Sequence, residues 1–226
     1  MHVTAHPSIL YFGTPVALLS TVNEDGSANL APMSSVFWLG WRCFLGLSGA
    51  SKTTENMRRT RQVVINLPSS AQVGAVDRLA RTTGTNPVPR DKLKRGYRYV
   101  KDKFACAEVT AVPSETILPP RVAECPVQLE AVLEHEHGYD QNGPLAGRIA
   151  VIEARMTRLH AEESILMDGH ADRVDPDKWR PLIMSFQEFY GLGPKIHPSK
   201  LGEIPEELYR TPDFERARAP LRRAAE

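Results

Sequence analysis

Residues 15–48 read PVALLSTVNEDGSANLAPMSSVFWLGWRCFLGLS, and this stretch predicts three β-strands in quick succession. Residues 15–22 are apolar and β-branched, and they end just before Asp25-Gly26, a dipeptide that supplies the positive φ angles of a tight hairpin turn. Residues 28–37 and 42–48 are the next two predicted strands, with a turn between them. We therefore expect three neighbouring antiparallel strands near the start of the chain.

The residues that follow predict one more strand between two short helices. Ser51 precedes a polar segment, 52–60, and a hydroxyl in that position is typical of a helix N-cap. Residues 62–67, QVVINL, predict a strand, and residues 69–80 predict a second helix. Residues 81–103 are rich in Gly, Pro and Lys, and no hydrophobic period emerges from them.

The second half of the chain returns to strand-forming sequence. Apolar and polar residues alternate over 126–135 and again over 148–159, which is the pattern of half-buried strands. Asp175-Pro176, a capping residue followed by proline, predicts the start of a helix that runs to Tyr190. Strands early and late with few helices favour a mainly β fold, an antiparallel barrel with helical decoration. We expect one domain over residues 1–194 and a polar C-terminal surface extension over 195–226.

Composition narrows the classes of function. The chain has 226 residues with 28 Lys and Arg against 27 Asp and Glu, a formal charge of +1, so we expect no nucleic-acid partner held by bulk charge. No segment is long and apolar enough to predict a membrane span. The three cysteines, Cys43, Cys106 and Cys125, are widely spaced, which favours reduced thiols and a cytoplasmic location.

Two neighbouring segments concentrate groups able to bind a phosphate and a flat ring. At Ser51-Lys52-Thr53, two hydroxyls, an ammonium group and free backbone N–H groups meet at the positive end of a predicted helix. The other segment, residues 29–35, combines small side chains with Pro32, which predicts an irregular edge where backbone groups are free to meet a ring. The alternative is that Ser51 is only a helix cap and that Pro32 marks only an edge strand.

The order of these motifs resembles a known family. Asn29-Leu-Ala-Pro-Met-Ser-Ser, then Ser51-Lys-Thr-x-x-Asn56 and Val63-Val-Ile-Asn-Leu67, resemble the flavin reductase-like domain family, the flavoredoxin-type FMN-binding proteins. The resemblance extends over roughly residues 15–190. Gly147-Arg148-Ile149 stands where short-chain flavin:NAD(P)H reductases of that family usually carry Gly-Asp-His, which favours the flavoredoxin-like branch.

The resemblance implies a homodimeric antiparallel split β-barrel with FMN bound near the dimer interface. It implies an oxidoreductase that transfers electrons from NAD(P)H or a partner protein to flavin, oxygen or an organic acceptor; the alternative is a non-catalytic FMN carrier. No catalytic residue is identified. The implied cofactor-binding residues are Asn29, Ala31, Pro32, Met33, Ser34, Ser35, Ser51, Lys52, Thr53 and Asn56.

Two weaker patterns have ordinary explanations. His135 and His137 share one face of a predicted strand and could begin a metal site, but nothing supplies a fixed third ligand, so no metal is predicted. Residues 92–103 mix Lys and Arg with two tyrosines, and acidic residues dilute this basic and aromatic stripe. We expect the segment to be a solvated loop near the mouth of the cofactor site.

Overall fold

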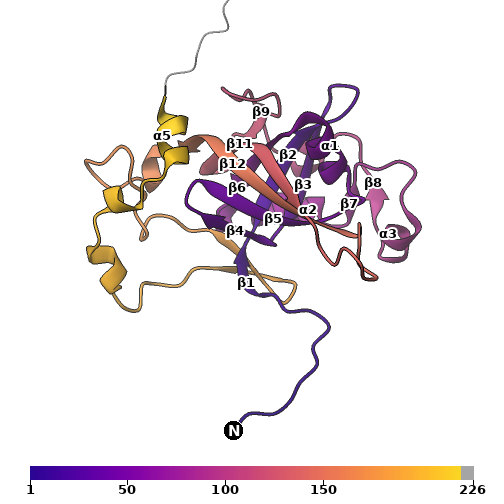
Figure 1. Cartoon of the computed structure of the whole chain (residues 1–226), viewed down its shortest axis with the longest axis horizontal. Coiled ribbons are helices and arrows are strands. Elements are labelled where there is room, and N and C mark those ends of the chain that lie inside the picture. Colours follow the sequence, from indigo (N-terminus) through magenta and orange to yellow (C-terminus); the bar gives the residue numbers. More distant parts are fainter. Residues whose placement is uncertain (220–226) are drawn as a thin grey trace, which may run out of the picture.

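The computed structural model describes residues 1–219, and a seven-stranded antiparallel sheet forms its centre (Figure 1). The strand order is β3-β2-β6-β11-β12-β5-β4. The bounds of these strands are β2 Ala17–Val22, β3 Ala28–Met33, β4 Val36–Leu39, β5 Arg42–Ser48, β6 Gln62–Leu67, β11 Val127–His137 and β12 Ile149–Ala161. The strands predicted over 15–22, 42–48, 62–67, 126–135 and 148–159 are confirmed.

The sheet curls because its two edges are neighbours in the chain. Strands β3 and β4 lie at opposite ends of the strand order, yet only Ser34 and Ser35 connect them. The Gly46 amide donates to the Ser35 carbonyl at 2.9 Å, which fixes this corner against β5. A Cβ atom on Gly46 would lie 3.2 Å from Cβ of Ser35, so glycine permits the close approach. The prediction of a mainly β, antiparallel split β-barrel with helical decoration is confirmed.

The predicted single strand over residues 28–37 is wrong, because the chain turns at Ser34-Ser35 and forms two strands. The first three predicted strands therefore do not form one set of three adjacent strands. Strand β2 pairs with β3, and β4 pairs with β5, but these two hairpins lie at opposite edges of the sheet. Alternation of apolar residues identifies strands, whereas the partner of each strand depends on where the sheet bends.

The helix predicted over residues 175–190 is also wrong. This segment contains a hairpin of β13 (Leu182–Ser185) and β14 (Glu188–Gly191), and β13 also pairs with β1 (Phe12–Pro15). Phe186 and Gln187 form its turn with φ angles of 45° and 70°. The Asp175 carboxylate caps only a local turn, accepting from the Asp177 amide at 2.8 Å.

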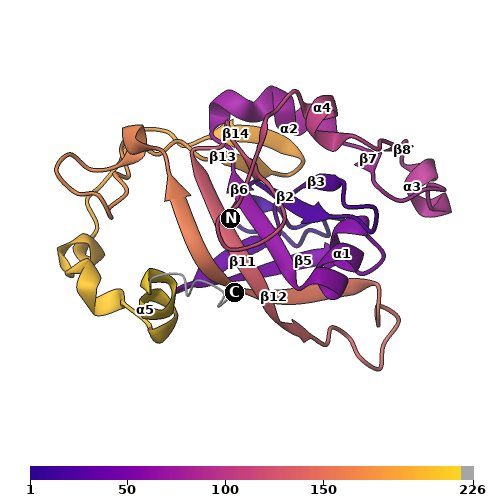
Figure 2. The ribbon, with the colours of Figure 1, turned by 90° about the horizontal axis from the view of Figure 1, so that it is seen from above.

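Helices pack against the part of the sheet formed by β2, β3 and β6 (Figure 2). The helices predicted over 52–60 and 69–80 are confirmed as α1 (Lys52–Thr60) and as a 3-10 turn followed by α2 (Val73–Leu79). Two apolar cores result, because neighbouring residues of β2 face opposite ways: Leu19 lies in the barrel core and Leu18 in a second core beneath α2 and α4 (Lys103–Ala107).

The remaining elements are short. They are α3 (Arg90–Lys94), α5 (Pro212–Arg218), the strand pairs β7 (Thr82–Thr83) with β8 (Arg98–Tyr99) and β9 (Ala111–Val112) with β10 (Arg121–Val122), and the 3-10 turns η1 (Ser70–Gln72), η2 (Glu163–Ile165), η3 (Lys200–Glu203) and η4 (Glu206–Tyr209). Helix α5 lies against the turn between β4 and β5 (Figure 1). The last residues of the predicted extension, 220–226, lie outside the described residues.

Candidate functional site

A cleft of about 570 Å³ opens beside the corner where the sheet closes. Its walls come from the β3–β4 corner, the start of α1, the segment after α2 and the β13–β14 hairpin. Its volume is in the range of small-molecule sites. The cleft brings together these predicted site residues: Ala31, Pro32, Met33, Ser34, Ser35, Ser51 and Thr53.

The start of α1 presents a helix N-terminus to this cleft. The Ser51 side chain caps the helix by accepting from the Thr54 amide at 3.1 Å. The Thr54 hydroxyl in turn donates to the Ser48 carbonyl at 2.9 Å, which ties the helix start to the end of β5. Ser51 is therefore both a helix cap and part of the cleft wall, at the end of the helix whose dipole favours an anion.

Part of the cleft wall is cationic, and sequence reasoning did not single out these residues as a site. Arg81, Lys92 and Arg95 line the cleft together with Tyr97. Within residues 1–219, none of these three cations forms an ion pair with a carboxylate. The segment 92–103, predicted to be a solvated loop near the mouth of the cofactor site, contributes Lys92, Arg95 and Tyr97 to the cleft wall, but it contains parts of α3 and β8 rather than a loop alone.

Burial and neighbouring positive charges lower the pKa values of two lysines in this region. The Lys92 amine donates to the Thr83 hydroxyl at 3.1 Å, and burial, followed by the charge of Arg95, lowers the pKa of Lys92. Lys103 is 1% exposed and donates to the Thr82 hydroxyl at 2.7 Å. Burial lowers the pKa of Lys103 to about 8. The cleft lining contains three cations and one carboxylate, Asp77, and this positive balance favours an anionic ligand.

Three predicted site residues lie outside the cleft lining. Asn29 and Asn56 are buried, and both side-chain amides donate to the Thr21 hydroxyl, at 3.3 and 3.1 Å. The Asn29 amide also donates to the Thr53 hydroxyl at 3.1 Å. These bonds tie α1 to β2 and β3, so the two asparagines hold the cleft wall in place from behind.

Lys52 is the third predicted site residue outside the cleft lining, and its side chain pairs with two carboxylates. Its amine lies 2.9 Å from the Glu55 carboxylate and 3.7 Å from that of Glu24. The hydrogen bond that Lys52 donates to Glu55, with the nearby charges of Glu55 and Glu24, raises the pKa of Lys52 despite partial burial. Two acidic neighbours therefore offset its charge.

The other candidate features have local partners. The His137 ring lies 2.8 Å from the Glu153 carboxylate, and in the described part of the chain no group of three or more His, Cys, Asp or Glu side chains is arranged to hold a metal ion. All three cysteines are free thiols. Among the described helices, none has the length and apolar character needed to cross a membrane.

Comparison with known proteins is consistent with this geometry. Residues 9–191 match the flavin reductase like domain. The chain is 37% identical over 190 residues to the uncharacterised protein YdfE of Bacillus subtilis, covering 84% of this chain and 89% of YdfE. The fold is similar to flavoredoxin of Desulfovibrio vulgaris (TM-score 0.72, 22% identity, 90% of this chain and 100% of that one). It is also similar to nitrilotriacetate monooxygenase component B of Bacillus cereus (TM-score 0.66, 21% identity, 84% and 89%).

Proposed function

Since the chain belongs to the flavin reductase like domain family, we propose that it is an FMN-dependent oxidoreductase whose flavin binds in the cleft beside the β3–β4 corner. The observation that carries the proposal is the division of the cleft wall into an apolar part and a cationic part. Met184 and Phe189 are partly exposed and offer apolar surface suited to a flat ring, and the cations lie on the segment after α2. FMN has the same division between ring and phosphate.

The described residues fit each part of that cofactor. The backbone of residues 31–35 would face the ring, because the β3–β4 corner leaves an edge of the sheet open there. The phosphate would meet Lys92, Arg81 and Arg95, whose charges have no carboxylate partner within residues 1–219, together with the Ser51 end of α1. We assign Lys52 a smaller part, since Glu55 and Glu24 already neutralise it.

A bound flavin supplies the electron-transfer chemistry, and the polypeptide positions it and sets its electrostatic surroundings. We infer that electrons come from NAD(P)H or a partner protein and pass to flavin, oxygen or an organic acceptor. The structural likeness to a monooxygenase component B supports a partner among these routes. We also infer a cytoplasmic protein with one FMN-binding domain over residues 1–194 and a surface extension over 195–226.

We infer a homodimer as well. Strand β4 is an edge of the main sheet, and its side chains Phe37 and Leu39 are 54% and 64% exposed. Two large apolar side chains side by side on an open sheet edge are the kind of surface that a second copy covers.

The first experiment tests the phosphate end of the cleft by titrating flavin-free protein with FMN and with riboflavin. We expect Lys92→Ala to weaken FMN about 10- to 150-fold, the loss of one charge-assisted contact of roughly 1.5–3 kcal/mol. Riboflavin has no phosphate, so its affinity should hardly change. Lys94→Ala is the matched control, because Lys94 is an exposed lysine of the same helix α3 outside the cleft lining.

Equal affinity of the wild type for FMN and riboflavin would contradict the phosphate assignment. Lys52→Ala separates the two lysines that could meet the phosphate, and we expect it to weaken FMN less than Lys92→Ala does. Oxidation of NADH and NADPH under air, with and without added FMN, then tests turnover. A protein that binds FMN but oxidises neither nucleotide, alone or with added FMN, would favour the carrier alternative or a protein electron donor.

A further inference from the structure

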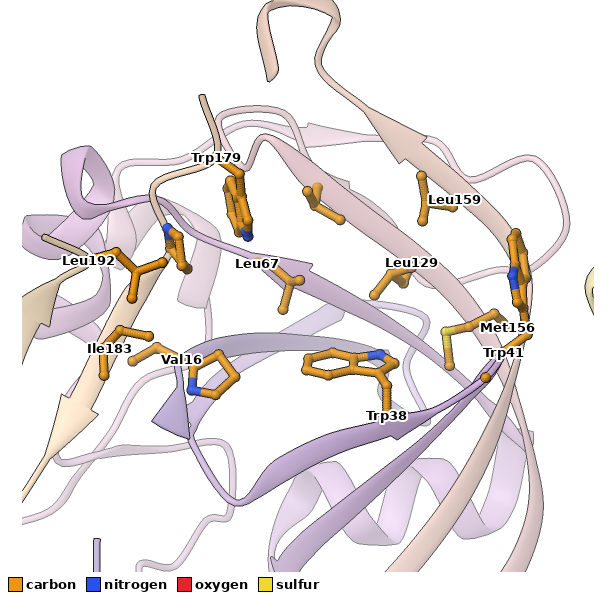
Figure 3. Close-up of a pocket in the computed structure, with 14 residues that line it drawn as sticks. Val16, Trp38, Trp41, Leu67, Leu129, Met156, Leu159, Trp179, Ile183 and Leu192 are labelled. Carbon is orange, nitrogen blue, oxygen red and sulfur yellow. The ribbon is translucent and has the colours of Figure 1, made fainter. Parts of the chain in front are cut away.

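A second cavity, of about 530 Å³, lies on the other side of β13 from the flavin cleft (Figure 3). Neighbouring residues of β13 divide between the two spaces, because Ile183 lines this cavity and Met184 lines the cleft. All three tryptophans of the chain, Trp38, Trp41 and Trp179, line it. We call it the tryptophan cavity.

The lining of the tryptophan cavity is apolar throughout. It contains leucines, valines, prolines, a methionine, an isoleucine, a glycine and the three indoles, and it contains no charged side chain. A phosphate or carboxylate placed there would lose its water without gaining a partner, which is costly. Flat aromatic rings, in contrast, gain both apolar burial and favourable stacking against indoles. The cavity therefore selects against charge and for aromatic surface.

One polar atom in the lining lacks a partner. Nε1 of Trp38 is shielded from solvent and donates to no acceptor within residues 1–219. Its nitrogen-bearing edge faces Leu129 and Met156 in Figure 3. Leaving a buried donor unsatisfied costs about 1–3 kcal/mol. Met156 is a flexible side chain, so an oxygen atom of a ligand can reach this N–H after a change of Met156 rotamer.

The position of the cavity argues for a small molecule as its occupant. Trp38 lies between Phe37 and Leu39 in β4, and alternation along the strand places it on the opposite face from these exposed residues. A second copy that covers the outer face of β4 therefore does not reach the cavity. The floor of the cavity is deep, since Leu129 is 5% and Met156 2% exposed.

We propose that the tryptophan cavity binds a neutral aromatic compound of about two fused rings that carries one hydrogen-bond acceptor. The rings pack against the indoles and Leu129, and the acceptor accepts a hydrogen bond from the Trp38 Nε1–H group. This site goes beyond the proposed flavin function.

Three probes of nearly equal size test the chemistry of the site. They are 2-acetylnaphthalene, which is neutral with an acceptor; 2-isopropylnaphthalene, which is neutral without one; and 2-naphthoate, which is charged. The affinity of each is measured by calorimetry on the full chain, flavin-free and FMN-saturated. We expect 2-acetylnaphthalene to bind about 3- to 10-fold more tightly than 2-isopropylnaphthalene, as one neutral hydrogen bond allows. We expect 2-naphthoate to bind more weakly than either.

Trp38→Phe removes the N–H and keeps a ring in place. We expect this variant to bind the two neutral probes equally well, while Trp41→Phe, the matched control in the same cavity, keeps the preference for 2-acetylnaphthalene. If Trp41→Phe lost the preference and Trp38→Phe kept it, the donor would be Trp41 rather than Trp38, and the proposal would be overturned.

A measurement on the wild type does not depend on whether Trp38→Phe folds. With three tryptophans, an ¹⁵N spectrum contains three indole N–H signals, which Trp41→Phe and Trp179→Phe assign. We expect 2-acetylnaphthalene, and not 2-isopropylnaphthalene, to move the Trp38 signal downfield. Equal affinity for all three probes would overturn the proposal. So would the absence of binding together with a Trp38 signal that moves with protein concentration, because that result would make a second copy of the chain the occupant.

Discussion

Glu130 shows how a single buried residue can hold a charge inside this fold. Its carboxylate has no exposed surface and accepts hydrogen bonds from the amides of Glu115 and Thr116, at 2.8 and 2.7 Å. The His160 ring lies 2.8 Å away. Burial alone would raise the pKa of Glu130, but the hydrogen bonds from His160, Thr116 and the two amides outweigh it and lower the pKa to about 2. The ionised form is thus the one that the fold stabilises.

This lowered pKa predicts a pH dependence of stability. A carboxyl group with a depressed pKa contributes stability above its ordinary value of 4.5, and the contribution is lost as the pH falls toward 2. At about 1.4 kcal/mol for each pKa unit, the contribution is roughly 3 kcal/mol. We expect Glu130→Gln to lower the free energy of unfolding by about that amount near neutral pH and by much less near pH 2, as measured by urea titration.

Glu134→Gln is the control on the same strand. Its carboxylate is 2.6 Å from Arg155 but partly exposed, so its removal should cost less than about 1 kcal/mol. If the two variants lost the same free energy of unfolding, the buried hydrogen bonds of Glu130 would contribute no more to stability than an exposed ion pair.

The candidate site was predictable from sequence only where local signals exist. Ser51 stands at a helix start and Pro32 marks an irregular edge, and the structure places both in the cleft wall. Arg81, Lys92 and Arg95 lie in a segment without hydrophobic period, and only the packing of that segment against β3 and α1 brings them to the same cleft. Sequence shows that these residues are basic, but it does not show that they meet.

At the scale of elements, β4 carries two different surfaces. Trp38 faces the tryptophan cavity, while Phe37 and Leu39 are exposed, and Phe37 stacks on Phe44 with ring centroids 5.0 Å apart. A charge on the exposed face should prevent a second copy from covering it, because an unpaired charge in an interface is costly.

We expect Phe37→Glu to shift the protein from a dimer to a single chain of 25.2 kDa, as measured by light scattering at micromolar concentration. Leu118→Glu is the control, since Leu118 is 74% exposed on a distant loop and should leave the assembly intact. A wild type that scatters as one chain would refute the dimer itself.

Helix α5 is attached to the barrel by few contacts. Phe214 meets Trp41 edge to face at 5.4 Å, and Asp213 pairs with Arg42 at 2.7 Å. Gly40 lies against Thr211, where a Cβ atom would come within 3.0 Å of the threonine methyl group. The first turn of the helix therefore docks closely on the β4–β5 turn, and Ala217 in its last turn is buried as well.

We expect Phe214→Ala to weaken this docking by about 2 kcal/mol, because a partly buried aromatic side chain is lost. Amide hydrogen exchange in α5 (Pro212–Arg218) should accelerate, while exchange in β11 stays unchanged. Leu208→Ala, at a residue 75% exposed, should leave α5 as protected as in the wild type. Faster exchange throughout the barrel would show that α5 is part of the core rather than attached to it.

The elements themselves were largely predictable, and their connections were not. Strong alternation over 126–135 gave β11 correctly, whereas one capping signal at Asp175-Pro176 predicted a helix where the chain forms the β13–β14 hairpin. The hairpin depends on positive φ angles at Phe186 and Gln187, residue types that rarely adopt them. Tertiary pairing of β13 with β1 supports that turn.

At the scale of the whole molecule, the curled sheet and the hairpin create two unlike cavities. The cleft beside Ser35 is polar and cationic at one end, and the tryptophan cavity is apolar throughout. Val16 lines both of them. Strand β13, with Val16 bonded to it through the Leu182 carbonyl, therefore separates a space suited to phosphate from a space suited to neutral rings.

Because the wall between the two cavities is thin, binding in one cavity should be energetically coupled to binding in the other. Because protein interiors are nearly incompressible, an occupant that pushes Ile183 outward moves Met184 into the cleft, and the reverse also holds. We expect saturating 2-acetylnaphthalene to raise the Kd of FMN by some factor, and saturating FMN to raise the Kd of 2-acetylnaphthalene by the same factor, since coupling free energies are reciprocal. If neither ligand changed the Kd of the other, the two cavities would not be coupled through β13. A factor above 1 would mean that a ligand in either cavity weakens binding in the other through β13, so that the affinity of the protein for one compound reports the presence of the other.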